Sequence, residues 1–299
     1  MAMVEVDNLS KVYGTWPAIT EVSFSVERGE ILGFLGPNGA GKSTTMRILT
    51  CFQAPSSGTA RVGGCDILED SVAVRRQIGY LPESTPLYRD MTVRAYLHYC
   101  AALRGVPRRD REDRVDESIE KAQLQDVSDT IIAKLSKGYR QRVGIGQAMV
   151  HNPPVLVLDE PTIGLDPRQI IDTRGLIKSL GKDHTIILST HILQEVAMVC
   201  SGLAIINAGR LVAADSIANL TGASREGVLI QLRLKRAPKD LVERLKKLSG
   251  VLNVRCEQDA GGESTVTLEH KANLDLREEV AALAVKESWG LLELRRAET

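Results

Sequence analysis

The segment Gly36–Ser43, GPNGAGKS, has the residue types and spacing of a phosphate-binding loop. It fits the pattern G-x-x-x-x-G-K-[ST] and lies between the apolar run Ile31–Leu35 and a helical pattern that begins at Thr44. Glycines let backbone N–H groups turn inward around phosphates, and the N-terminus of the following helix adds positive potential. We therefore expect Lys42 to reach the β- and γ-phosphates of a nucleotide and the Ser43 hydroxyl to bind Mg²⁺. The alternative to a phosphate-binding loop is a glycine-rich turn with an exposed lysine and no role in binding.

Two acidic residues, Asp159 and Glu160, directly follow a second apolar run, Val155–Leu158. An unpaired buried carboxylate is costly, so acids at the end of a buried strand need a reason to be there. Alone, such a pair more often belongs to a solvated loop, but a phosphate-binding loop in the same chain reverses that preference. We expect Asp159 to bind Mg²⁺ through water and Glu160 to polarise the attacking water as a general base.

A histidine, His191, follows a third apolar run, Ile186–Leu188, in the sequence Ser189-Thr190-His191. A lone histidine is more often a packed or surface residue. Ligands of parallel sheets bind at the carboxyl ends of the strands, which favours contact between His191 and a γ-phosphate.

The elements that must hold these residues indicate an α/β core. Four short, continuous apolar runs suit strands buried on both faces, as in a parallel sheet covered by helices: 31–35, 155–158, 186–188 and 203–206. Residues 1–30 alternate instead and predict antiparallel strands around a turn at Gly14. Residues 87–150 have a helical, charged pattern, which indicates a mostly helical insert.

Residues 221–299 predict a second, smaller domain after a first domain of residues 1–220. Alternation around residues 230–234 is followed by two helical patterns, 241–248 and 276–283, with two alternating stretches between them and a last strand at 292–294. The order βαββαβ indicates a ferredoxin-like module. It contains no cluster of catalytic residue types, so regulation or interaction is favoured over chemistry there.

Length and composition exclude several classes of protein. The chain has 299 residues with 38 basic and 38 acidic side chains, so its overall charge does not point to nucleic acid or an acidic partner. No apolar run approaches the roughly 18 residues of a membrane-spanning helix, and the N-terminus lacks the layout of a signal peptide. The five cysteines are scattered without metal-ligand spacing, which predicts reduced thiols in a cytoplasmic protein.

Taken in order, the motifs of residues 1–220 resemble the nucleotide-binding domain of an ABC (ATP-binding cassette) transporter. After the phosphate loop come LPE at 81–83, LSKGY at 135–139, VLVLDEP at 155–161, IGLD at 163–166 and STH at 189–191. The ordered set is far more specific than any one motif. The resemblance implies a P-loop NTPase fold of the ABC type, with a mainly parallel core sheet, an N-terminal antiparallel β subdomain and the helical insert. The ferredoxin-like α+β domain would follow it.

The resemblance also implies roles for individual residues. Two such domains close head to tail, so that each ATP lies between the phosphate loop of one subunit and the LSKGY signature of the other. The ATP contacts implied within one chain are Tyr13, which would stack on adenine, and Gly36, Pro37, Asn38, Gly39, Ala40, Gly41, Lys42, Ser43 and Thr44. The contacts implied across the interface are Ser136, Lys137, Gly138 and Asp166. Catalytic roles are implied for Glu160, His191 and Lys42, and Mg²⁺ binding for Ser43, Glu83 and Asp159.

Two features depart from the family pattern. The signature is LSKGY where the family has LSGGQ, so Lys137 replaces a glycine and Tyr139 a glutamine. Lys137 either adds positive charge near the ATP of the partner subunit or points to solvent. Glu83 stands where most relatives carry a glutamine, and as a hard oxygen ligand it still suits Mg²⁺. In both features the sequence resembles the exporter branch of the family, which includes drug-export and gliding-motility ATPases.

The function implied is that of an ATPase subunit, with ATP and Mg²⁺ as cofactors. It would dimerise with a second copy or a paralogous subunit and drive a separate membrane-spanning permease, to which it would bind at the cytoplasmic face of the membrane. The charged run Arg104–Arg114 is either a solvated face or a contact with lipid headgroups or the permease.

The sequence is also compatible, less well, with two other functions. A soluble ABC ATPase that acts on a ribosome or on DNA is the main alternative. A single cassette, the absence of sustained heptads and the lack of a basic excess argue against it, and no nucleic-acid partner is expected. A small-molecule kinase or GTPase would not account for LSKGY and IGLD.

Overall fold

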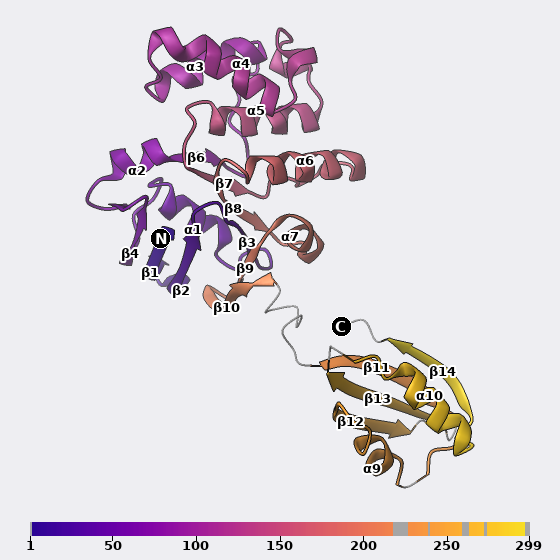
Figure 1. Cartoon of the computed structure of the whole chain (residues 1–299). Coiled ribbons are helices and arrows are strands. Elements are labelled where there is room, and N and C mark those ends of the chain that lie inside the picture. The colour runs from indigo at the N-terminus through magenta and orange to yellow at the C-terminus, as the bar shows by residue number, and fades with distance from the viewer. Residues whose placement is uncertain (1, 218–226, 239, 259–262, 272–273, 297–299) are drawn as a thin grey trace. The chain divides into compact units, whose positions relative to one another are not determined.

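The computed structural model describes residues 2–217, 227–238, 240–258, 263–271 and 274–296 (Figure 1). They belong to two compact units, Met1–Ile217 and Ala218–Thr299, each with its own apolar core. The domain boundary predicted at residues 220 and 221 lies outside the described residues. None of the helices in the described ranges is long and apolar enough to cross a membrane.

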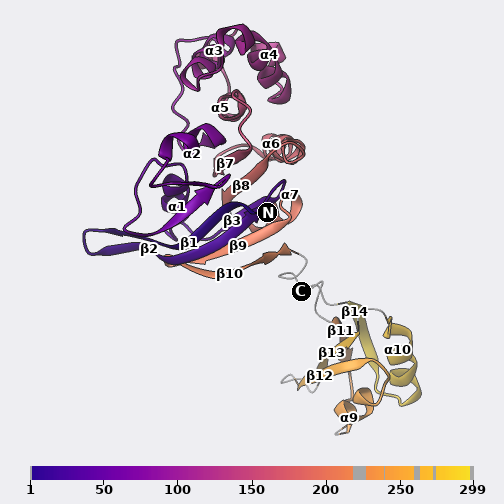
Figure 2. The ribbon, with the colours of Figure 1, turned by 60° about the vertical axis from the view of Figure 1, so that its left-hand side comes forward.

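A six-stranded sheet forms the centre of the first unit (Figure 2). Five of its strands run parallel, and the sixth pairs antiparallel at one edge. In spatial order the strands are β10 (Arg210–Ser216), β9 (Gly202–Asn207), β3 (Ile31–Leu35), β8 (Thr185–Thr190), β7 (Val155–Asp159) and β6 (Ile78–Leu81). The four apolar runs predicted as buried strands are β3, β7, β8 and β9.

The strands are continuously apolar because the sheet is covered on both faces. Val155 and Val157 of β7 belong to one core cluster, and Leu156 and Leu158 belong to the other. Each fully buried side chain of this kind stabilises the fold by about 1.5–3 kcal/mol. A strand with two apolar faces therefore fixes the position of whatever residues follow it.

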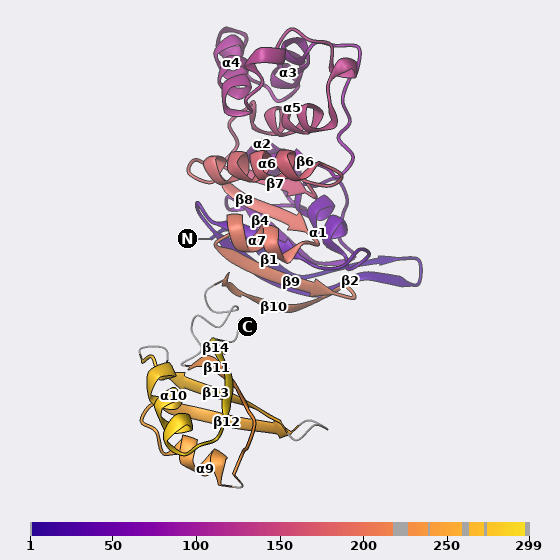
Figure 3. The ribbon, with the colours of Figure 1, turned by 90° about the vertical axis from the view of Figure 1, so that its right-hand side faces the viewer.

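The helices of the first unit fall into two groups. The helical insert contains α3 (Val93–Leu103), α4 (Arg111–Lys121) and α5 (Lys137–Met149), joined by short 3-10 turns, and it lies on the same side of the sheet as α6 (Pro167–Leu180) (Figure 3). The remaining helices are α1 (Lys42–Leu49), α2 (Ser71–Gln77) and α7 (Leu193–Val199). Helical structure thus occupies the range predicted for the insert.

A second sheet in the first unit is antiparallel. Its order is β2 (Trp16–Glu27), β1 (Ala2–Tyr13), β4 (Ser57–Val62) and β5 (Cys65–Asp66). Strands β1 and β2 form the hairpin expected around Gly14, whose φ of +59° suits glycine in the turn. The register pairs Tyr13 with Trp16 at the end of this hairpin.

Strand β6 is not apparent in the sequence, because Gly79 and Tyr80 interrupt its apolar pattern. A Cβ atom at Gly79 would lie 1.9 Å from the carbonyl oxygen of Ala148 in α5. The close approach of that helix therefore requires glycine inside the strand. Because this glycine interrupts the apolar run, β6 cannot be recognised as a buried strand from the sequence.

The second unit has the ferredoxin-like architecture expected from the sequence. Its elements are β11 (Gly227–Leu234), α9 (Leu241–Lys246), β12 (Val251–Gln258), β13 (Ser264–Lys271), α10 (Arg277–Lys286) and β14 (Leu291–Arg296). The sheet order is β12-β13-β11-β14, and every pair is antiparallel. Ile230, Leu232, Leu245 and Val280 are among the buried residues of its core.

Strand register in the six-stranded sheet brings the predicted chemistry to one edge. Leu35, the residue before the phosphate loop, pairs with Thr190, and Asp159 pairs with Ser189. The parallel strands β3, β7 and β8 therefore end side by side. Residues that are far apart in the chain meet at their carboxyl ends, where ligands of such sheets bind.

Candidate nucleotide-binding site

The phosphate loop turns tightly between β3 and α1. A Cβ atom at Gly36 would lie 2.3 Å from the Ile206 carbonyl oxygen, and one at Gly41 would lie 2.5 Å from a methyl carbon of Ile19. Gly41 also has a φ of +105°, which a residue with a side chain rarely adopts. Both positions therefore require glycine, and the loop brings its backbone to the N-terminus of α1.

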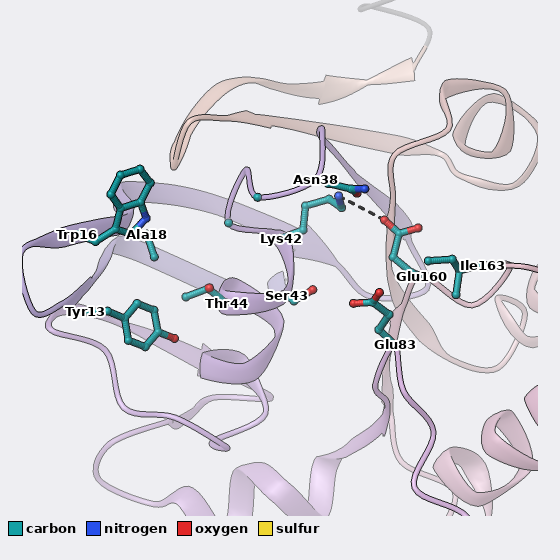
Figure 4. A pocket seen from close by; sticks show the side chains of 12 residues that line it. Tyr13, Trp16, Ala18, Asn38, Lys42, Ser43, Thr44, Glu83, Glu160 and Ile163 are labelled. Carbon is teal, nitrogen blue, oxygen red and sulfur yellow. Dashed lines mark ion pairs between the residues drawn. The ribbon is translucent and has the colours of Figure 1, made fainter.

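Lys42 is the first residue of α1, and its ammonium group lies inside the loop. Nζ donates hydrogen bonds to the carbonyl oxygens of Gly36 at 2.8 Å and Pro37 at 3.3 Å. It also lies 3.3 Å from Oε1 of Glu160, and both side chains are 6% exposed (Figure 4). A lysine that is this well buried is held by its partners and is not a freely solvated surface charge.

The two acids at the end of β7 are held differently. Asp159 is buried and accepts a hydrogen bond from the Ser189 hydroxyl of the neighbouring strand. Glu160 has a φ of +49°, and its backbone N–H donates to the carbonyl oxygen and the hydroxyl of Ser189, at 3.1 and 3.2 Å. A left-handed backbone at a buried glutamate is an unusual conformation that recurs at functional sites.

His191 lies beside Glu160. Its Nδ1 atom is 3.0 Å from Oε2 and 3.2 Å from Oε1 of that carboxylate. The Glu160 carboxylate thus lies between the Lys42 ammonium and the His191 imidazole, which come from the ends of two other strands. This arrangement can hold a carboxylate in place beside a reacting phosphate.

A cavity of about 530 Å³ opens beside these groups. Its lining comes from the phosphate loop, the β1–β2 hairpin and the segments that follow β6 and β7: Tyr13, Trp16, Ala18, Asn38, Gly39, Gly41, Lys42, Ser43, Thr44, Glu83, Glu160 and Ile163. The volume is in the range of small-molecule sites. The cavity has charged residues at one end and aromatic residues at the other, and this combination suits the phosphates and the base of a nucleotide. The remaining loop residues, Gly36, Pro37 and Ala40, are not among those that line the cavity.

The aromatic end of the cavity contains Tyr13 and also Trp16, which no motif of the sequence predicted. The Tyr13 hydroxyl donates to Oε1 of Gln53 at 2.6 Å, and Nζ of Lys11 lies 5.5 Å from the centre of its ring. Trp16 pairs with Tyr13 in the hairpin, lines the same cavity and is 72% exposed. The signal in the sequence is a tryptophan two residues after Gly14, the glycine of the predicted turn.

The residues present fit a Mg²⁺ ion that is bound together with phosphates. The Ser43 hydroxyl and the Glu83 carboxylate line the cavity, and Asp159 lies at the end of the adjacent strand. No group of three or more His, Cys, Asp or Glu side chains within the described ranges is arranged to hold a metal ion. Mg²⁺ usually takes one or two protein carboxylates and completes its shell with phosphates and water, so the Ser43 hydroxyl and the carboxylates of Glu83 and Asp159 suit it.

The negative charge near β7 also affects Tyr80 of β6. Burial and the Asp159 carboxylate raise the pKa of Tyr80 to about 12. The phenol therefore stays protonated at neutral pH and adds no charge to this edge of the sheet.

The residues predicted to act across a dimer interface are not among those lining the cavity. The Ser136 hydroxyl caps α5 by accepting a hydrogen bond from the Tyr139 backbone N–H at 3.3 Å, and Asp166 caps α6 in the same way at Gln169, at 2.8 Å. Gly138 is buried beneath Gln169, where a Cβ atom would lie 2.7 Å from the side-chain carbon Cδ. A capping hydroxyl keeps its own hydrogen, so Ser136 can still donate to a phosphate.

Lys137 extends toward the IGLD segment of its own chain. A Cβ atom at Gly164 would lie 2.1 Å from Nζ of Lys137, and the side chain is exposed. It also lines a second cavity, of about 430 Å³, which shares Glu83 and Ile163 with the first. Lys137 thus connects the signature and the segment after Glu160 within one chain.

Comparisons with known proteins agree with this arrangement. The ABC transporter family model matches residues 19–163. A bacitracin transport ATP-binding protein of Bacillus licheniformis is 35% identical over 232 residues, which cover 77% of this chain and 75% of that protein. A daunorubicin resistance ATP-binding protein of Streptomyces coeruleorubidus is 32% identical over 298 residues, which cover 91% and 93%. The solved structure of an ATP-binding subunit of an ABC transporter, 31% identical, has a TM-score of 0.67 over 75% of this chain and 93% of that chain.

A glycine loop at the end of β3, an acid pair at the end of β7 and a histidine at the end of β8 define an ATP-binding cassette ATPase. With these relatives, the chain belongs to the ABC transporter family as an ATP-binding subunit. The P-loop fold class and the ATPase activity predicted from the motifs are confirmed at this level. The names of the two relatives do not favour the alternative of an ATPase acting on a ribosome or DNA.

Proposed function

We propose that two copies of this chain enclose two Mg·ATP, hydrolyse them, and drive export through a separate membrane-spanning permease. The observation that carries the proposal is the Glu160 carboxylate, held 3.3 Å from the Lys42 ammonium and 3.0 Å from the His191 imidazole at the edge of the cavity. No other acid in the phosphate-loop cavity has two such partners from neighbouring strand ends. Glu83 lines the same cavity but is exposed.

Each residue has a part in this reaction. Lys42 binds the β- and γ-phosphates, and Glu160 accepts a proton from the attacking water as a general base. His191 orients Glu160 and contacts the γ-phosphate. Ser43, Glu83 and Asp159 hold Mg²⁺, directly or through water, and the ion supplies charge neutralisation on the phosphates when it is bound. Tyr13 stacks on the adenine at the aromatic end of the cavity.

A second copy of the chain would complete the site. Ser136, Lys137 and Gly138 lie at the N-terminus of α5, where the helix dipole and the Gly138 backbone suit a γ-phosphate. Asp166 begins α6 nearby in the same chain. Because these residues do not line the cavity of their own chain, they would reach ATP only by facing the phosphate loop of a partner, which is either an identical or a paralogous subunit.

Export and the membrane partner are supported by the relatives, whose names include bacitracin transport and daunorubicin resistance. We expect the chain to bind the permease at the cytoplasmic face of the membrane. The basic and acidic residues of the Arg104–Arg114 run lie at the end of α3 and the start of α4, where the insert offers a charged surface to that partner.

The experiment that tests the proposal uses Glu160→Gln. The amide keeps the shape of the side chain but cannot act as a general base, so ATP should bind without turnover and hold the two copies together. Sedimentation with Mg·ATP should show a dimer for Glu160→Gln and a monomer without nucleotide. Asp183→Asn, which changes an exposed carboxylate paired with Lys121, is the matched control and should hydrolyse ATP as the wild type does. A Glu160→Gln chain that stays monomeric with Mg·ATP would contradict the two-site dimer.

A further inference from the structure

A third buried carboxylate, outside the predicted site, contacts the threonines that neighbour Glu160 and His191 in the sequence. Glu195 of α7 is 1% exposed. Its Oε2 atom accepts hydrogen bonds from the hydroxyls of Thr162 at 2.9 Å and Thr190 at 2.8 Å, and Oε1 lies 3.3 Å from Nη2 of Arg174. An acid this deeply buried is tolerated because two hydroxyls and a guanidinium satisfy it.

The three partners of Glu195 come from the three segments that carry the predicted chemistry. Thr162 follows Glu160 by two residues, and Thr190 directly precedes His191. Arg174 lies in α6, the helix that begins after its N-cap Asp166. One carboxylate thus joins the end of β7, the end of β8 and the helix whose first turn Asp166 caps.

Thr190 has a special place among these partners. Its hydroxyl oxygen also accepts a hydrogen bond from the Ile192 backbone N–H at 3.1 Å, and its carbonyl oxygen accepts one from the Gly36 N–H at 3.3 Å. The residue between Thr190 and Ile192 is His191. The Thr190 hydroxyl, which donates to Glu195, therefore also fixes the turn that contains His191. Through its carbonyl oxygen Thr190 contacts Gly36, the first residue of the phosphate loop.

We propose that Glu195 is a positioning residue for ATP hydrolysis: by binding the hydroxyls of Thr162 and Thr190 it sets His191 against Glu160 and ties both to helix α6. This inference rests on the proposed function. Glu195 lies behind the pair and outside the lining of the cavity, so it acts through the geometry of Glu160 and His191 and has no contact of its own with the nucleotide. A catalytic group displaced by about 1 Å can lose two orders of magnitude in rate.

The first test is steady-state ATP hydrolysis by the full chain. Glu195→Gln keeps the size of the side chain and removes its charge, and it should lower kcat by about 10- to 100-fold while KM for ATP stays within about twofold of wild type. Thr190→Val, which lacks the hydroxyl, should show the same split, and Thr190→Ser, which keeps it, should retain near wild-type kcat. Thr185→Val is the matched control, because it removes a buried hydroxyl, the acceptor for the Gly29 N–H, from the opposite end of β8. It should leave kcat unchanged.

A double-mutant cycle separates positioning from a merely structural role. In a His191→Ala background, Glu195→Gln should lower kcat little further, because the group that it positions is gone. Full additivity of the two effects, wild-type kcat in Glu195→Gln, or equal losses in Thr190→Ser and Thr190→Val would each overturn the inference. If Glu195→Gln does not fold, the Thr190 pair decides the matter. A wild-type chain without ATP turnover would instead reject the proposed function.

Discussion

Lys42 and Glu160 form a buried ion pair, with Nζ 3.3 Å from Oε1 and each side chain 6% exposed. The sequence places these residues 118 positions apart, at the start of α1 and just after β7. Their contact has two consequences, since it joins the lysine proposed to bind phosphate to the glutamate proposed as general base, and it makes each the principal counter-charge of the other. Loss of one partner therefore affects both chemistry and stability.

Lys42→Ala should abolish ATP hydrolysis and also destabilise the first unit by about 3 kcal/mol, because the Glu160 carboxylate is left buried beside a neutral residue. Phosphate release and urea unfolding without nucleotide measure the two effects. In the double variant Lys42→Ala/Glu160→Gln the loss of stability should be smaller than the sum of the single losses. Unchanged turnover in Lys42→Ala would reject the assigned loop.

Glu83→Gln should retain Mg²⁺-dependent hydrolysis, with kcat within about threefold of wild type, if Glu83 serves as an oxygen ligand on the metal side. The amide oxygen can replace the carboxylate oxygen as a ligand. Glu83→Ala removes that oxygen and should raise the Mg²⁺ concentration needed for half-maximal rate by about tenfold. Complete loss of activity in Glu83→Gln would mean that the negative charge itself is essential.

Trp16 should report on nucleotide binding. The chain has two tryptophans, and Trp289 is 2% exposed in the second unit, whereas Trp16 is 72% exposed and lines the cavity. Addition of ATP should change the fluorescence emission, and the change should vanish in Trp16→Phe, which keeps an aromatic ring. We expect the Trp16 ring to contact the base beside Tyr13, so Trp16→Ala should weaken ATP binding by about fivefold or more, since a base–aromatic stack contributes about 1–3 kcal/mol. Tyr13→Phe, which loses only the bond to Gln53, is the control for the neighbouring ring. Emission that ATP leaves unchanged would contradict a place for Trp16 in the site.

His151 should make the first unit sensitive to mild acid. Burial, aided by the nearby Arg104, lowers the pKa of His151 to about 4. The pKa of His151 in the unfolded chain is about 6.5, so between about pH 6.5 and pH 4 the unfolded chain binds a proton at His151 that the folded chain does not bind. The contribution of His151 to the free energy of unfolding is therefore fully present above about pH 6.5 and is lost as the pH falls toward 4. Between pH 7 and pH 5 the loss attributable to this group is about 2 kcal/mol. Urea unfolding at both pH values should show a smaller loss for His151→Asn, and equal losses would contradict the assignment.

Much of the site is predictable from local patterns, and the reason is physical. A phosphate loop needs glycines, a lysine and a helix start within a few consecutive residues, so Gly36–Ser43 is evident from the chain alone. Asp159 and Glu160 stand out because they follow a buried apolar strand in a chain that also carries a phosphate-binding loop. The fold class follows from the same runs, because strands apolar on both faces belong to a covered parallel sheet.

Other features depend on packing between distant segments. Strand β6 cannot be recognised from the sequence, because Gly79 interrupts its apolar pattern. The structure requires glycine there, since α5 packs closely against the strand. Trp16 is recognised as a candidate site residue only in the structure, because the hairpin places it beside Tyr13 at the cavity. Glu195 has no motif of its own, since its partners Thr162 and Arg174 lie 33 and 21 positions away.

The sequence by itself determined the chemistry available to this protein: which loop has the phosphate-binding pattern, which acids follow which strand, and which family it resembles. Only the tertiary structure decided which of these groups touch. Parallel register places Leu35 beside Thr190 and Asp159 beside Ser189, and the turns after those strands then bring Lys42, Glu160 and His191 together. The reason is that a residue's type is local, whereas a distance of 3 Å between strand ends depends on the pairing of the whole sheet.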